Sequence, residues 1–454
     1  MYKYNVQKKI ALYERRESQM SEKEIRKEKQ RKLHDILGIL CGVAVVLIGV
    51  ISGIIAKNAP VDMETALANA SHIGRETAGK VETMSGVTLL YASDWQEKYP
   101  EIYDSWMQNE ENSEAINYLE EYPQLVTLYE PYGFSKFYSS ARGHFYDVQD
   151  ISETGRPHKT ANCWTCKTPD FTHLVNETGV EAYSIAFEDV QVQEGISCYN
   201  CHANNVDKKE LVVTHTYMID AVGEDFDSID AANLACGQCH VEYYFYPGTL
   251  ATTLPHTSLE SMSPDAILSY YNNDLLVDGE PFADYTNPRT GVRQIKVQHP
   301  EFETYLGEGT VHGGTYNCAD CHMGTVVTDN GRKTYPNHYL TSPLDNEELI
   351  ANECSSCHAD LVAEVTAVQE KADARTREVA DMLVDLTEKL AVIVEKGEMT
   401  DEQLAPIRSL ARDAQFYWDF VFVENSNGAH NPTLTTNCLD KAAELAEEAL
   451  GMLK

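Results

Sequence analysis

Five Cys-x-x-Cys motifs are distributed along the chain between residues 163 and 357, and they constrain its fold more than any other feature. They hold ten of the 12 cysteines, so only Cys41 and Cys438 lie outside them. A histidine directly follows four of the motifs, whereas the first motif is followed by a lysine. The motif residues are Cys163, Cys166 and Lys167; Cys198, Cys201 and His202; Cys236, Cys239 and His240; Cys318, Cys321 and His322; and Cys354, Cys357 and His358.

Cys-x-x-Cys-His is the attachment motif of c-type haem. The two thiols bond to the porphyrin edge, and the adjacent histidine ligates the iron. Zinc sites also use cysteine pairs, but they need closed sets of four ligands. Two-residue spacings with trailing histidines also make a poor disulfide framework. We therefore predict five haem c groups, numbered one to five in the chain order of their motifs.

Lys167 sets the first haem apart. Lysine is normally protonated in water, but metal coordination in a dry pocket can remove that proton. An iron with this ligand and an open opposite face could carry out chemistry, whereas a haem closed by two histidines only passes electrons. Closing the other four haems needs four more histidines, and the sequence offers His144, His312, His338 and His430. A purely structural lysine in place of a lost histidine is the alternative.

The motif spacing predicts a fold with a haem-filled core. The motifs begin at residues 163, 198, 236, 318 and 354, so the gaps are 35, 38, 82 and 36 residues. Short gaps leave little chain for regular structure between haems. After the last motif, apolar residues recur with helical spacing, and Gly397 is the predicted stop. We predict a mainly α multihaem cytochrome c with sparse β-structure and long C-terminal helices over residues 358–396, 401–424 and 436–453.

The N-terminal part has the pattern of a membrane anchor. Residues 36–56 form an uncharged apolar run of 21 residues, which as a helix would span about 31 Å. Residues 1–35 hold 11 Lys and Arg against 6 Asp and Glu, and such a basic flank remains in the cytoplasm. We predict a cytoplasmic tail at 1–35 and a transmembrane helix at 36–56, with a cleaved signal segment as the alternative. The rest would be extracytoplasmic, in the periplasm or on the outer face of the cell membrane.

The remaining chain is strongly acidic. The whole chain has a net charge of −35, so without the +5 of residues 1–35 the remainder carries −40. Phosphate backbones repel such a surface, and no nucleic-acid partner is expected. We expect a pentahaem region at 57–357 and a helical region at 358–454. Amphipathic helices at a chain end commonly pack within the chain, against a partner, or both.

One Lys-ended motif followed by four His-ended motifs resembles the pentahaem cytochrome c nitrite reductases, which form ammonia. Three further segments carry the resemblance: an Arg-Gly-His segment at 141–146, the third haem segment at 236–245 and a Lys-x-Gln-His-Pro-Glu segment at 296–301. The similarity covers roughly residues 120–435. It implies a six-electron reduction of nitrite to ammonium at the lysine-ligated haem, with hydroxylamine or sulfite as side substrates. The alternative is a non-catalytic multihaem electron-transfer cytochrome.

The resemblance also implies ligand and catalytic roles. Distal ligands would be His338 for haem two, His144 for haem three, His430 for haem four and His312 for haem five. Lys167 would be the proximal ligand of the active haem, with Tyr243, His299 and an arginine around the substrate. The family arginine commonly lies in a Leu-Arg-Thr-Gly-like context, where this chain has Glu153. Arg156 is the nearest replacement and Arg142 is the second choice.

A calcium ion is predicted beside the active haem. Glu242, Gln298 and the carbonyl groups of Tyr243 and Lys296 offer the hard oxygen ligands that calcium prefers, although ordinary polar surface is the alternative. The resemblance places such an ion here. It further implies a homodimer formed through the C-terminal helices and a membrane quinol dehydrogenase, a tetrahaem cytochrome, as electron donor.

Overall fold

The computed structural model describes residues 26–27, 29–32, 77–81, 87–139, 142–327 and 334–454. The chain divides into two compact units, Met1–Asn69 and Ala70–Lys454. In the first unit the described residues are helical. The segment 36–56, predicted to be a transmembrane or signal segment, lies outside the described residues. Among the helices that the structure does describe, none has the length and apolar character required to cross a membrane.

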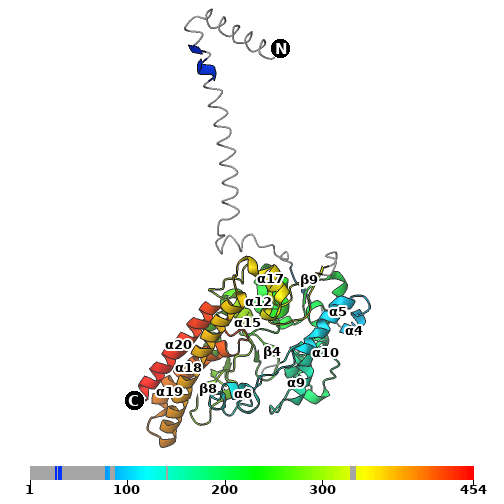
Figure 1. Cartoon of the computed structure of the whole chain (residues 1–454). Helices are drawn as coiled ribbons and strands as arrows, with labels where there is room; N and C mark the ends of the chain where they lie inside the picture. The colour runs from blue at the N-terminus through cyan, green and yellow to red at the C-terminus, as the bar shows by residue number, and fades with distance from the viewer. Residues whose placement is uncertain (1–25, 28, 33–76, 82–86, 140–141, 328–333) are drawn as a thin grey trace, which may run out of the picture. The chain divides into compact units, whose positions relative to one another are not determined.

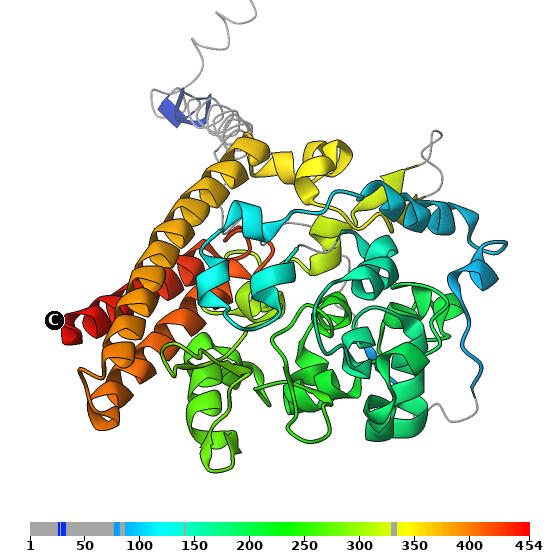
Figure 2. The same cartoon turned by 90° about the horizontal axis from the view of Figure 1, so that it is seen from below.

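Three long helices lie side by side along one edge of the second unit (Figures 1 and 2). They are α18 (Leu361–Lys396), α19 (Asp401–Phe422) and α20 (Pro432–Met452). The helices predicted from apolar spacing are therefore present. The third begins four residues earlier than predicted, because Asn431 caps it through the Leu434 amide and Pro432 occupies its first turn.

The ends of these helices follow from local chemistry. Gly397 ends α18 in the left-handed conformation, with φ of 61°, which glycine adopts without steric cost. Thr400 and Gln403 then form a capping box that starts α19. The turn between the two helices is therefore as predicted.

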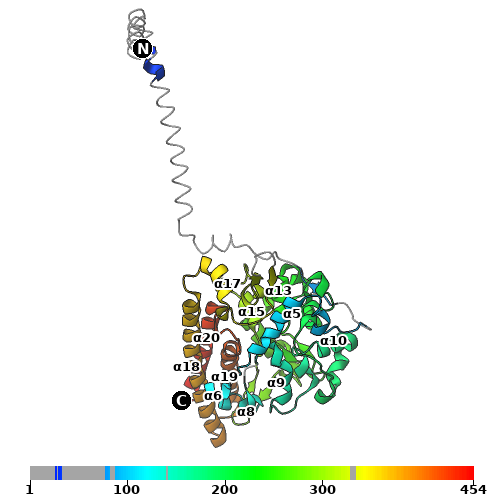
Figure 3. The same ribbon diagram turned by 45° about the vertical axis from the view of Figure 1, so that its right-hand side comes forward.

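The bundle shares one apolar core with the neighbouring loops. Trp418 of α19 is fully buried and stacks on Phe422 with ring centroids 4.8 Å apart. Leu383 and Leu390 of α18 lie in the same cluster, which continues to Tyr271 outside the bundle. The turned view keeps the three helices together on one side of α13 and α15 (Figure 3). The bundle therefore supports one side of the region that carries the motifs.

The rest of the unit is built from short helices. The remaining α-helices are α4 (Ala92–Trp95), α5 (Pro100–Met107), α6 (Tyr118–Glu121), α7 (Leu125–Leu128), α8 (Phe134–Phe137), α9 (Asp147–Glu153), α10 (Pro169–Thr178), α11 (Cys198–His202), α12 (Thr216–Val222), α13 (Ala231–Gly237), α14 (Pro264–Ser269), α15 (Glu301–Leu306), α16 (Cys318–His322) and α17 (Glu347–Asn352). The first and fifth Cys-x-x-Cys motifs include the 3-10 helices η3 (Ala161–Trp164) and η11 (Cys354–Ser356).

Strands are few and short, as predicted. Within the described residues they form two-stranded sheets: β1 (Gly79–Lys80) with β2 (Val212–Val213), β3 (Tyr244–Phe245) with β4 (Thr252–Thr253), β5 (Leu276–Val277) with β6 (Glu280–Pro281), β7 (Tyr285–Thr286) with β8 (Arg293–Gln294), and β9 (Thr325–Val327) with β10 (Thr334–Pro336). The β1–β2 pair is parallel and the others are antiparallel. The mainly helical class is therefore confirmed.

Candidate functional site

Each histidine that follows a Cys-x-x-Cys motif faces the distal histidine expected for it. The ring centroids are separated by 6.5 Å in His202–His338, 6.2 Å in His144–His240, 6.0 Å in His322–His430 and 6.1 Å in His312–His358. A metal–imidazole bond is about 2 Å long. When two imidazoles bind the same metal from opposite sides, their ring centroids are therefore roughly 6 Å apart. The residues present therefore fit four metals that are each held between two histidines.

Local sequence explains how the motifs are presented. In α11 and α16 the motif forms the whole helix, so cysteines three residues apart and the histidine four residues after the first share one face. Asn317 starts α16, where its side chain accepts from the Asp320 amide at 3.0 Å and the Asp320 side chain accepts from the Asn317 amide at 2.8 Å. Helix α13, with the third motif, contacts both α11 and α16. The second, third and fourth motifs therefore lie close together.

Lys167 has a different environment. Its Nζ lies 3.1 Å from Oδ1 of Asp147, a buried residue at the start of α9. Burial lowers the pKa of Lys167, but attraction to Asp147 and the hydrogen bond outweigh it, so this pKa lies above its usual value. Burial raises the pKa of Asp147 to about 6, although the attraction of Lys167 lowers it. Asp147 therefore holds the lysine amine in a buried ion pair, which ligation of a metal by the deprotonated amine would replace.

Of the predicted catalytic side chains, His299 is close enough to Lys167 to be affected by its charge, and Tyr243 and Arg156 lie near the cysteines of the same motif. Burial, helped by the positive charge of Lys167, lowers the pKa of His299 to about 4, although the negative charge of Glu301 raises it. Burial raises the pKa of Tyr243 well above its usual value. Burial also lowers the pKa of Arg156, although the neighbouring tyrosines Tyr138 and Tyr243 raise it. His299 Nδ1 and Arg156 Nε are buried without a hydrogen-bond partner among the described residues, so both offer polar atoms to a ligand.

The structure distinguishes the two candidate arginines. The Arg156 guanidinium stacks on the Phe134 ring at 3.9 Å and is partly buried. Arg142 instead pairs with Asp150 at 2.5 Å and covers the Tyr146 ring at 4.1 Å. Glu153, which stands at the family's arginine position, is exposed and accepts a hydrogen bond from Gln149. Arg156 is therefore the better placed of the two.

Three of the four predicted calcium ligands, Glu242, Gln298 and Lys296, are linked by hydrogen bonds. Glu242 is fully buried, and its carboxylate accepts from the Tyr271 hydroxyl at 2.9 Å and the Gln298 amide at 2.6 Å. The Gln298 side chain donates to the carbonyl of Lys296 at 2.8 Å. Burial raises the pKa of Glu242 well above its usual value. A buried carboxylate beside amide and carbonyl oxygens fits a hard cation, because the ion would offset the cost of burying the negative charge.

A buried ion pair ties this segment to the helical bundle. Lys296 Nζ lies 3.5 Å from Oδ2 of Asp419 in α19, and their side chains are 1% and 0% exposed. Asp419 also accepts from the Val297 amide at 2.9 Å and from the Tyr129 hydroxyl. The ammonium lies over the rings of Tyr129, Phe134 and Tyr138 at 5.0, 5.4 and 5.5 Å. The bundle therefore positions the backbone next to His299.

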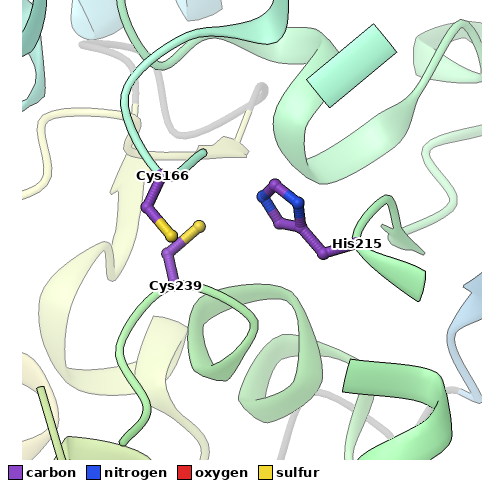
Figure 4. A group of neighbouring side chains, drawn as sticks. All are labelled: Cys166, His215 and Cys239. Atoms are coloured by element: carbon purple, nitrogen blue, oxygen red, sulfur yellow. The ribbon is translucent and has the colours of Figure 1, made fainter. Parts of the chain in front are cut away.

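A further group of possible metal ligands brings together Cys166, His215 and Cys239 (Figure 4). Their ligand atoms lie within 4.8 Å of one another. The two cysteines come from the first and third motifs, so both sulfurs are needed for haem attachment. His215 is buried and stacks on Tyr217 at 5.0 Å. We interpret this group as the meeting point of two attachment motifs rather than as a separate metal site.

Comparison with known proteins identifies the family. The cytochrome c552 family model matches residues 92–454. This chain belongs to the cytochrome c552 family. Its solved relatives include the catalytic subunit of the cytochrome c nitrite reductase of Desulfovibrio desulfuricans, which has two calcium sites. That structure is 28% identical, with a TM-score of 0.71, over 81% of this chain and 87% of the other. The family resemblance predicted from the motifs is confirmed.

Two other cytochromes of known structure are more distant from this chain. The outer cell wall cytochrome OcwA is 17% identical, over 67% of this chain and 48% of the other, with a TM-score of 0.37. The undecahaem S-layer cytochrome of Carboxydothermus ferrireducens is also 17% identical, over 68% and 41%, with a TM-score of 0.35. Similarities at this level carry no argument about fold or function.

The sequence does not reveal the roles of Asp147, of Asp419 or of Glu424, a buried residue that contacts His430. Asp147 directly follows the Arg-Gly-His segment at 141–146, which is a weak signal. Asp419 and Glu424 lie in the C-terminal part, where the apolar pattern drew attention to packing. With 71 acidic residues in the chain, three buried carboxylates do not stand out in the sequence.

The buried pair predicts a large effect on stability. Asp419→Asn keeps the hydrogen-bond acceptor but leaves Lys296 buried without its counterion, so we expect a loss of about 3 kcal/mol or more in the free energy of unfolding. Asp385→Asn is the matched control, because its pair with Lys389 is exposed, and should cost less than about 1 kcal/mol. Urea denaturation of the haem-loaded proteins measures both. Equal losses in the two variants would contradict the prediction.

Proposed function

We propose that this cytochrome c552 reduces nitrite to ammonium at the haem attached to Cys163 and Cys166 and ligated by Lys167. The chain is an oxidoreductase of the nitrite reductase class. The observation that carries the proposal is a contrast between the motifs. Four motif histidines each face a second imidazole, whereas Lys167 contacts Asp147. His299 lies near Lys167, and Arg156 and Tyr243 lie near Cys163 of the same motif. Nitrite takes up six electrons and eight protons to give ammonium and two water molecules. When bound, haem c supplies the electrons and the metal that holds the substrate nitrogen.

The side chains have complementary roles. Arg156 binds the nitrite oxygens, since a guanidinium keeps its charge and donates several hydrogen bonds. His299 is neutral at pH 7 because burial lowers its pKa to about 4, so its N–H can donate to the same anion. Tyr243 holds its phenolic proton because burial raises its pKa, and it can position later nitrogen species. The same site would admit hydroxylamine or sulfite as side substrates.

The other four motifs would hold haems that supply electrons to the substrate site. We propose that they are haems two to five, each ligated by its motif histidine and by His338, His144, His430 or His312 respectively. The contacts of α13 with α11 and α16 support close placement of haems two, three and four. The proximity of Cys166 and Cys239 supports the same for haems one and three. Haem three would then distribute electrons to the active haem.

The setting of the enzyme follows from the same proposal. We propose that residues 57–454 work outside the cytoplasm, in the periplasm or on the outer face of the cell membrane. Electrons would come from a membrane quinol dehydrogenase of the tetrahaem cytochrome type. Exposed apolar side chains on α18, including Val362 and Val392, support a homodimer formed through the helical region 358–454.

Product analysis tests the function. The haem-loaded protein with reduced viologen and nitrite should release ammonium, and Lys167→His should lose most of this activity because a different ligand replaces the amine. Ammonium and viologen consumption should agree at six electrons for each nitrite. No spectral change on adding nitrite to the reduced protein, together with no ammonium, would favour the non-catalytic electron-transfer cytochrome.

The arginine assignment has its own test. Arg156→Lys keeps the charge but loses the planar pair of donors, so we expect kcat/KM for nitrite to fall by about 100-fold. Arg142→Lys is the matched control and should change kcat/KM less than threefold, because Arg142 is paired with Asp150. Steady-state kinetics on proteins of equal haem content gives both numbers. A large loss in Arg142→Lys with normal Arg156→Lys would reverse the assignment.

We also propose that calcium binds between Glu242, Gln298 and the carbonyl groups of Tyr243 and Lys296. The support is the fully buried Glu242 carboxylate, which accepts from the Gln298 backbone amide, together with the hydrogen bond from the Gln298 side chain to the Lys296 carbonyl. The ion would fix the segment that carries His299 and add positive charge near an anionic substrate. The Desulfovibrio desulfuricans relative, which has two calcium sites, adds support for such a site here.

Calcium affinity should depend on Glu242. Glu242→Gln removes the charged ligand and should weaken calcium binding by about tenfold or more, whereas exposed Glu280→Gln should bind as the unmodified protein does. Because burial raises the pKa of Glu242, calcium must displace a proton, and affinity should rise with pH. Isothermal titration calorimetry after chelation measures both effects. Equal affinities in the two variants would contradict the assignment.

A further inference from the structure

One histidine of the four pairs is hydrogen-bonded to a buried carboxylate. His430 Nδ1 lies 2.6 Å from Oε1 of Glu424, and the Glu424 side chain is only 2% exposed. The other carboxylate oxygen accepts from the Ser426 hydroxyl at 2.6 Å, and that hydroxyl accepts from the His430 amide at 2.9 Å. Glu424 is therefore held in one orientation between α19 and α20.

The other paired histidines have weaker or more exposed partners, or, for Nδ1 of His144, no hydrogen-bond partner among the described residues. The Nδ1 atoms of His202, His322 and His338 lie 2.8, 2.9 and 2.9 Å from the backbone carbonyls of Glu210, Thr341 and Pro336. His358 contacts the Glu364 carboxylate at 2.7 Å, but that side chain is 49% exposed. Glu301 lies 3.8 Å from His240 Nδ1, beyond hydrogen-bond distance. Within the described residues, only His430 combines a short contact with a buried acid.

A carboxylate on the far nitrogen changes the imidazole as a ligand. Because Nε2 must present its lone pair to a metal, Nδ1 carries the proton and donates it to Glu424. A buried negative charge pulls on this proton and makes Nε2 a stronger electron donor, which favours ferric over ferrous iron. An exposed carboxylate has a smaller effect because water screens it.

We infer that Glu424 is a positioning residue that lowers the reduction potential of the haem held by Cys318, Cys321, His322 and His430. The inference rests on the haem arrangement in the proposed function. Haem four would be the last of the bis-histidine haems to be reduced. Since α16 contacts α13, it would pass its electron readily to haem three and thus toward the active haem.

Potentiometric titration of two variants tests this role. Glu424→Gln keeps the shape and the contacts but removes the charge. One low-spin haem should shift upward so that its oxidised-to-reduced ratio at a fixed potential falls at least tenfold, about 59 mV. Glu364→Gln removes the matched exposed carboxylate at haem five and should change its ratio less than threefold. Haem content and helical circular dichroism check that both proteins are intact.

The inference is overturned if Glu424→Gln titrates like the unmodified protein, or if its shift is no larger than that of Glu364→Gln. If Glu424→Gln loses haem, the role of Glu424 is tested on the unmodified protein instead. Near-infrared magnetic circular dichroism of its ferric state should then show one bis-histidine haem with an imidazolate-like charge-transfer band, and a spectrum without that band overturns the inference. Nitrite reduction without a potential shift refutes this inference alone, whereas the shift without nitrite reduction refutes only the proposed function.

Discussion

Two imidazoles about 6 Å apart share a metal productively only when the backbone carrying each is held within a fraction of an ångström. The pairs found here join residues far apart in sequence, such as His144 and His240 or His202 and His338. Short helices cannot supply that precision by apolar packing alone, because they bury little surface. The precision comes from hydrogen bonds that cap the helix ends, such as the capping box of Asn317 and Asp320 at α16, and from the apolar core shared with the three long helices.

The sequence predicts one part of this arrangement well and another part poorly. The motif helices and the long C-terminal helices follow from local patterns, and the capping box at Thr400 is visible in the order of the residues alone. Which histidine faces which is predictable only by resemblance, because no local signal joins residues 96 positions apart such as His144 and His240. Asp147, Asp419 and Glu424 could not be singled out, since their importance lies in burial, which an acidic composition conceals.

The helical bundle has a larger role than support. Asp419 in α19 fixes Lys296 and the Val297 amide, two residues before His299, and Glu424 just beyond the same helix contacts His430. One helix therefore connects the proposed substrate site with a proposed electron carrier. The absence of an arginine at position 153 affects only the loop that follows α9, because Arg156 in that loop lies near the tyrosines of the site.

Arg156 and Lys296 stack on the same two rings, Phe134 and Tyr138. Two cationic side chains thus lie against the same two aromatic rings, inside a protein whose net charge is −35. For the proposed reaction the charge of the reactant changes sign, from the nitrite anion to the ammonium cation. The two cations attract nitrite and repel ammonium, while the acidic exterior attracts ammonium. In the proposed reaction, this distribution of charge would favour binding of the reactant and release of the product.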